Sequence, residues 1–148
     1  MHLVITVAGL PALERELGAR FATLLRLTFY DLAENAVVGG LYSKGTPVDT
    51  GFARASWWLG VNQPGDPVQP AQPPVGSRHV KWLPSLDPLQ LAAVRAGDIL
   101  YLSTNCAYIR PLEYGHSAQA PQGMLRLAVA AAQQMADENA RTLRARRA

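Results

Sequence analysis

Cys106, Glu113 and His116 form the set of residues closest to a catalytic constellation, because they bring a thiol, a carboxylate and an imidazole into one short stretch. A thiol can act as a nucleophile if an imidazole takes its proton and a carboxylate orients the imidazole. Nothing in the sequence indicates that the three converge on a pocket, so we interpret them as a buried thiol and polar loop residues. The other histidines, His2 and His79, do not have metal-ligand spacing with His116. We therefore expect no catalytic residue, metal or cofactor.

The triplet Asp49-Thr50-Gly51 is one that retropepsin-type aspartic proteases place at a catalytic dyad, where two carboxylates share a proton and activate water. Those enzymes have an apolar strand before the aspartate, a small residue after the glycine and an almost all-β chain. Here Gly45-Thr46-Pro47 precede the triplet and Phe52 follows it. A retropepsin-like protease that uses Asp49 is therefore only the alternative of another class, and we expect the protein not to be an enzyme.

The element that positions Asp49 is a tight turn followed by an apolar aromatic stretch. Pro47 presets the backbone for a turn and Gly51 supplies a permissive position at which the chain can reverse. The alternation from Phe52 onward predicts a strand, with Trp57 and Trp58 on opposite faces.

The rest of the chain alternates between helical and extended patterns. The predicted elements are a strand at 2–8, a helix at about 12–38 that Gly39-Gly40 ends, a short helix that Asp87 caps and Pro88 opens, a strand at 98–104 and a long helix after Pro121 and Gly123. This order predicts a single α+β domain over residues 1–148. In it, a small, mostly antiparallel sheet packs against a long N-terminal and a long C-terminal helix.

Two segments stand apart from this core. Residues 62–76 carry five prolines, so we expect a loop that is either a mobile linker or a segment held by a partner. Trp82 beyond it is either core or an interface anchor. The C-terminal tail at 141–148 is basic, and its arginines either form a solvated helix end or contact nucleic acid non-specifically. They are Arg141, Arg144, Arg146 and Arg147.

The composition is that of a folded chain, with 49% hydrophobic residues and a formal net charge of +3. Its single cysteine excludes an internal disulfide. No apolar run approaches the ~18 residues of a membrane span, and the first residues lack the basic start of a secretory signal. We expect a protein that is made in the cytoplasm.

Four short pieces in this order and spacing resemble the tail-completion, neck and minor tail proteins of long-tailed bacteriophages. The pieces are the turn at 46–51 with Arg54 and Ser56 after it, the segment 97–105 with its closing Asn105, the segment with Tyr108 and 112–117, and the helix opening at 120–124. The resemblance covers residues 12–140. The N-terminal strand and the proline-rich loop depart from the family pattern and leave the position in the neck or tail open.

The resemblance implies a non-enzymatic virion protein, assembled in the host cytoplasm. It would form a ring, expected to be a hexamer, that caps the tail tube, joins it to the head connector and lets packaged DNA pass through its lumen. A minor tail or tail-terminator protein is the alternative within the virion. Contacts with a neighbouring subunit or another partner could use two charge sets and several aromatic anchors, and each of these residues has an intramolecular alternative. They are Asp49, Arg54, Arg110 with Glu113, Trp57, Trp58, Trp82 and Tyr114.

Overall fold

The computed structural model describes residues 2–6, 14–49, 51–64 and 88–146. Three strands form one antiparallel sheet in the order β1-β3-β2, with β1 at His2–Thr6, β2 at Trp57–Val61 and β3 at Ile99–Thr104. β3 is central because both other strands pair with it, Leu3 and Leu59 each lying opposite Leu102.

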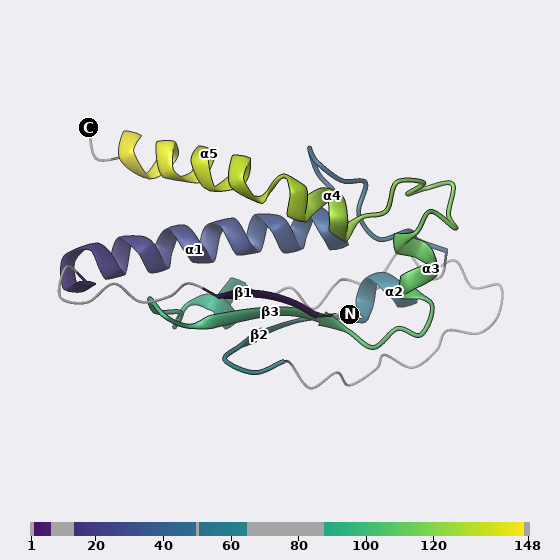
Figure 1. Ribbon diagram of the computed structural model, residues 1–148, viewed down its shortest axis with the longest axis horizontal. Helices are drawn as coiled ribbons and strands as arrows, with labels where there is room; N and C mark the ends of the chain where they lie inside the picture. The colour runs from purple at the N-terminus through teal and green to yellow at the C-terminus, as the bar shows by residue number, and fades with distance from the viewer. Residues whose placement is uncertain (1, 7–13, 50, 65–87, 147–148) are drawn as a thin grey trace.

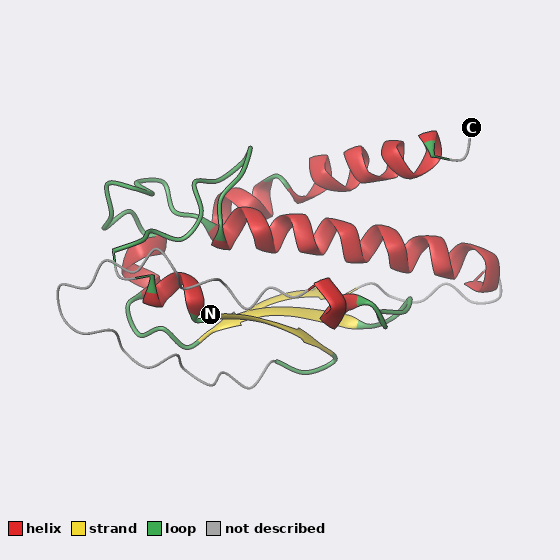
Figure 2. Ribbon diagram, turned by 180° about the vertical axis from the view of Figure 1, so that it is seen from behind, coloured by secondary structure: helices red, strands yellow, loops and turns green. Residues whose placement is uncertain are grey.

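The long helix α1 (Glu14–Val37) lies between the sheet and the C-terminal helices α4 (Leu125–Ala130) and α5 (Ala132–Ala145), as Figures 1 and 2 show. α5 runs back along α1, and the Asn139 side chain donates to the Asp31 carboxylate at 2.6 Å. The α+β class predicted from the sequence is confirmed, with the C-terminal helices packed on α1.

Side chains from every layer meet in one core. One stripe of α1 and alternate positions of β2 are buried, as a helical period and a strand period require, whereas the central strand β3 is buried at Leu100 and throughout Leu102–Thr104. The apolar residues that are at most 2% exposed in these elements and in α5 are Phe29, Leu32, Ala33, Ala36, Val37, Trp57, Leu100, Leu102 and Met135.

The strand expected from Phe52 onward is wrong in its first half. Phe52–Ala55 form a short helix, α2, and β2 starts only at Trp57. Gly51 has φ 87°, a left-handed conformation that glycine tolerates, and its carbonyl accepts the Ala55 N–H at 2.9 Å. The alternation of the two tryptophans still holds, because Trp57 is fully buried and Trp58 is half-buried on the other face.

The remaining predicted elements differ in detail. The short helix that Pro88 opens is a single 3₁₀ turn, η1 (Pro88–Leu91), and its expected cap, Asp87, lies outside the described residues. The segment after Tyr108 forms a five-residue helix, α3 (Ile109–Glu113). The long C-terminal helix is interrupted at Ala131, which separates α4 from α5.

Candidate interaction surfaces

Thr46 organises the turn from within the protein. Its side chain is fully buried; the hydroxyl donates to the Ala36 carbonyl at 3.0 Å and accepts the Trp57 indole N–H at 2.9 Å. The Arg54 guanidinium donates to the Thr46 carbonyl through Nε at 3.2 Å and Nη2 at 3.0 Å, and burial lowers the pKa of Arg54. Trp57 and Arg54, both expected as contacts with a partner, are therefore tied to the protein's own turn.

Asp49, in contrast, is exposed and interacts electrostatically with Tyr108. The Phe52 and Tyr108 ring centroids lie 6.2 Å apart, and Tyr108 is 41% exposed. Partial burial, the neighbouring Cys106 and the Asp49 carboxylate together raise the pKa of Tyr108 to about 12. Asp49 and Tyr108 thus share one patch of surface.

Glu113 is a buried cap of α4 and has a different partner from the one the sequence suggested. Its carboxylate is 1% exposed and accepts the backbone N–H groups of Met124 at 3.1 Å, Leu125 at 2.8 Å and Arg126 at 2.9 Å. Arg126, instead of Arg110, forms the ion pair, with Nε 3.0 Å from the carboxylate. A carboxylate here satisfies donors that a helix start leaves open.

Arg126 had no place in the sequence-based expectations. The one feature of the sequence that could have pointed to Arg126 as a partner of Glu113 is its position in the first turn of the helix that follows Gly123. Gly123 has φ 84°, and a Cβ there would lie 2.4 Å from the Glu113 carbonyl oxygen, so this close approach requires glycine.

Cys106, Glu113 and His116 each have surroundings or partners other than one another. Cys106 is buried, the Glu113 oxygens are occupied by α4, and His116 Nδ1 lies 2.9 Å from the Pro111 carbonyl oxygen. Each side chain therefore has a separate structural environment.

Three of the four pieces of sequence that carry the phage resemblance, at 46–56, 108–117 and 120–124, lie at one end of the molecule, which we call the loop end (residues 38–49, 51–56 and 105–124; Figures 1 and 2). The fourth piece, 97–105, is mostly the central strand β3 and enters the loop end only at Asn105. Val48 and Gln119 join the two halves of the loop end by reciprocal hydrogen bonds of 2.9 Å each, from the Val48 N–H to the Gln119 side chain and from that side chain to the Val48 carbonyl. Tyr114 is 66% exposed here, and its ring lies 5.1 Å from the Arg126 guanidinium carbon. Arg110 is exposed on α3, the short helix that ends just before Tyr114.

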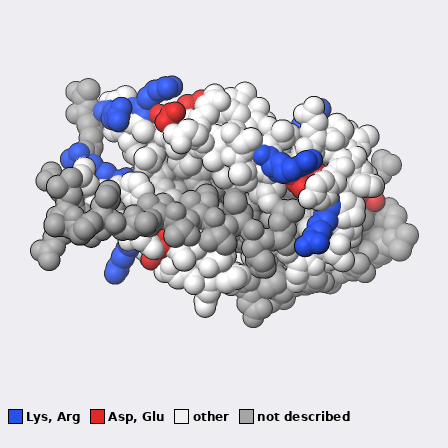
Figure 3. Space-filling view, in the orientation of Figure 1, with Lys and Arg blue, Asp and Glu red and all other residues white. Residues whose placement is uncertain are grey.

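The opposite end of the molecule is basic. Arg141, Arg144 and Arg146 are exposed where α5 ends, alongside the half of α1 that carries Arg20 and Arg26. Figure 3 shows Lys and Arg side chains around this end, with a few acidic ones between them. The basic end is therefore formed by more than the tail that the sequence singled out.

Trp82, Arg147 and most of the proline-rich stretch, from residue 65 onward, lie outside the described residues. Trp58 is described, and its indole nitrogen is buried without a hydrogen-bond partner in the described structure.

Comparisons with known proteins found no matching family model, no matching curated protein and no matching solved structure. Within the described ranges, no helix is long and apolar enough to cross a membrane. Within the same ranges, no group of three or more His, Cys, Asp or Glu side chains is placed to hold a metal ion.

Proposed function

We propose that this chain is a structural, non-enzymatic protein of a phage virion. In this role it is a ring subunit of the neck that completes the tail and links the tail tube to the head connector. A minor tail or tail-terminator position is the alternative within the same class.

The observation that carries the proposal is that three of the four resemblance segments lie together at the loop end, while the fourth is the central strand β3 that leads into it. Segments far apart in sequence are joined there by the Val48–Gln119 bonds and by the Glu113 cap of α4. A surface fixed by internal bonds loses little conformational entropy on docking, which suits repeated contacts in an assembly. Asp49, Tyr108, Arg110 and Tyr114 are exposed on this support and are the partner contacts that we propose.

The basic end supports the second part of the proposal, contact with the DNA that passes through the ring. Exposed arginines attract phosphates irrespective of base sequence, and the interaction weakens as salt rises. Arg141, Arg144 and Arg146 supply that charge on the last turns of α5.

The mass of the purified protein in solution tests the ring. Light scattering over a concentration series, with and without phage tail tubes, should show a species near six times the 16.0 kDa of one chain, either free or bound to tubes. A stable dimer that ignores the tubes contradicts the proposal and favours the protease dyad. That alternative predicts proteolysis that Asp49→Asn abolishes.

The DNA contact has its own test. Changing Arg141, Arg144 and Arg146 together to Gln should reduce the salt dependence of duplex binding by about one unit of log–log slope for each phosphate that an arginine no longer neutralises. The matched Arg→Lys triple variant should keep most of the slope, because it preserves the charge. Equal slopes for the Gln variant and the natural protein would leave these arginines as solvated charge.

A further inference from the structure

The turn after α1 presents a leucine to solvent on a backbone that hydrogen bonds hold in place. Leu41 is 82% exposed. The Gly40 N–H donates to the Ser43 carbonyl at 2.8 Å, which closes the turn around Leu41, and the Tyr42 N–H donates to the Asn35 side chain at 3.1 Å. The leucine therefore occupies a defined position before any partner binds.

Two further contacts fix this turn, which we call the leucine turn (residues 38–46). Gly39 and Gly45 both have positive φ, and a Cβ on Gly45 would lie 2.5 Å from the Gly39 nitrogen, so the two arms cross where only glycine fits. The Tyr42 hydroxyl donates to the Glu138 carboxylate at 2.9 Å and ties the turn to α5. An exposed apolar side chain on a fixed backbone is suited to anchor an interface, because docking removes its surface from water without the entropic cost of ordering the backbone.

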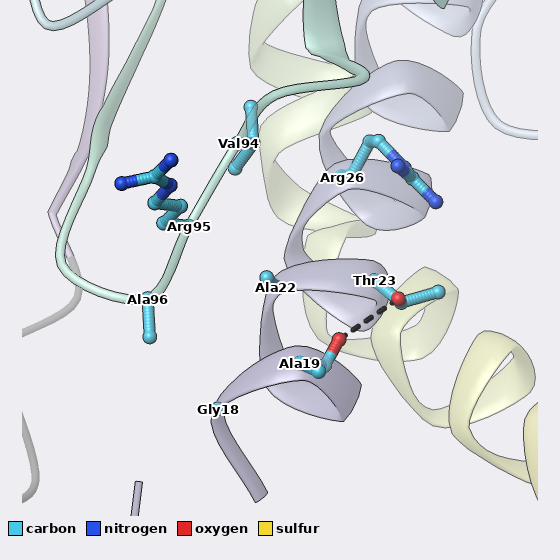
Figure 4. Close-up of a pocket in the computed structure, with 8 residues that line it drawn as sticks. All are labelled: Gly18, Ala19, Ala22, Thr23, Arg26, Val94, Arg95 and Ala96. Atoms are coloured by element: carbon cyan, nitrogen blue, oxygen red, sulfur yellow. Dashed lines mark hydrogen bonds between the residues drawn. The ribbon is translucent and has the colours of Figure 1, made fainter. Parts of the chain in front are cut away.

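A hollow of about 450 Å³ lies farther back on α1, between that helix and the turn that precedes β3. Ala19 and Ala22 line it from α1, and Val94 and Ala96 line it from the turn. Figure 4 shows Ala22 of α1 and Val94 of the turn beside the gap, whereas the guanidinium groups of Arg26 and Arg95 point away from each other at its edges. The hollow thus has a mixed lining, with small apolar side chains between two cationic edges, and its volume has room for a leucine side chain.

The charges around the two features are complementary. Two carboxylates lie at the base of the leucine turn: Glu34 is exposed one turn before α1 ends, and Glu138 accepts the Tyr42 hydroxyl. One cation, Lys44, is exposed on the turn itself. Because two carboxylates face one lysine, the leucine turn carries a net negative charge, which attracts the arginines at the edges of the hollow.

We propose that Leu41 of one copy of this chain inserts between Ala19 and Ala96 of the next copy. The contact is head-to-tail, because the leucine turn and the hollow are different surfaces, separated along α1 by about 22 Å from Ala22 to Val37. Such a contact builds a closed ring if the rotation closes and a filament if it does not. The inference rests on the proposed ring and names the surfaces that would hold it together.

A mixing experiment tests this contact. Leu41→Ser removes the inserting side chain but keeps the hollow intact. Ala19→Trp fills the hollow but keeps Leu41. Light scattering should show each variant as a monomer, and an equimolar mixture should form a heterodimer and nothing larger, because only one productive contact remains. Leu89→Ser is the matched control, since Leu89 is 77% exposed elsewhere, and it should assemble like the natural protein.

Circular dichroism checks that the variants fold. If Ala19→Trp does not fold, Ala96→Trp, on the opposite wall of the hollow, takes its place in the experiment. If Leu41→Ser, or both Ala19→Trp and Ala96→Trp, form assemblies of the same size as the natural protein, the proposed contact is wrong, but the proposed function is unaffected. If the Ala19→Trp and Ala96→Trp variants form dimers, and adding Leu41→Ser abolishes those dimers, then Leu41 contacts Leu41 of the other copy. This result would also contradict the proposed contact. A natural protein that is monomeric in solution and on tail tubes overturns both the contact and the ring.

Discussion

Replacing Glu113 by Ala should destabilise the monomer severely. The substitution leaves the backbone N–H groups of Met124, Leu125 and Arg126 without their acceptor at the start of α4. Met124 and Leu125 are 0% and 6% exposed, so water does not easily replace the carboxylate. Each buried donor left unpaired costs about 1–3 kcal/mol.

The ion pair adds less to this total. The Arg126 side chain is 56% exposed, so its guanidinium can return to water when Glu113 is removed. Two buried donors at about 2 kcal/mol each therefore set the expected loss at about 4 kcal/mol. The free energy of unfolding of a domain of this kind is about 5–15 kcal/mol, so the expected loss is a large fraction of its stability.

Urea unfolding followed by circular dichroism measures this loss. With a slope of about 2 kcal/mol/M, the midpoint for Glu113→Ala should fall by about 2 M at an unchanged slope. Arg110→Ala is the control on the same short helix, and because Arg110 is exposed it should change stability by no more than about 0.5 kcal/mol. Glu113→Gln should fall between the two, because its amide keeps one acceptor oxygen but turns a donor toward the helix start.

A loss below about 1 kcal/mol for Glu113→Ala would refute the capping argument. If that variant instead kept its midpoint and lost only the assembled species, Glu113 would act between subunits, which is the alternative that the sequence left open.

Three other perturbations test separate parts of the structure. Thr46→Val keeps the shape but leaves the Trp57 indole N–H without its acceptor, so urea unfolding should show a loss of about 1–3 kcal/mol. Asp49→Asn should lower the pKa of Tyr108 from about 12 in a spectrophotometric titration, because the nearby carboxylate helps to raise it, and an unchanged titration would mean that the two groups do not interact. Asp98 accepts the Asn62 amide and the Arg95 N–H, which lower the pKa of its carboxyl. Its contribution to stability is therefore present above about pH 4 and is lost as pH falls through its lowered pKa; Asp98→Asn should remove this part of the acid dependence, and an identical acid profile would count against it.

The sequence alone determined the elements that an apolar pattern marks. The helix α1 was predictable from its apolar period and the strand β3 from its run of apolar, β-branched and aromatic residues, although the buried face of α1 is lined by Phe29 and the alanines as well as by Leu25 and Leu32. It also determined that the chain is an α+β domain, because the order of those patterns restricts how they can be layered.

Only the tertiary structure decided which residues bond to one another. Phe52–Ala55 matched a strand pattern, but the conformation of Gly51 starts a helix there. Glu113 is near Arg110 in the sequence, yet it binds the start of α4 and Arg126, because the tight approach at Gly123 brings that helix to it.

Leu41 and the hollow at Ala19 illustrate the same limit. A leucine beside two glycines and a run of small residues on a helix are ordinary in sequence. Exposure and a void depend on how segments distant in the chain pack around them. Periodicity reports the environment of a single element, whereas partners, caps and cavities are properties of several elements together, and these arise only when the chain is folded.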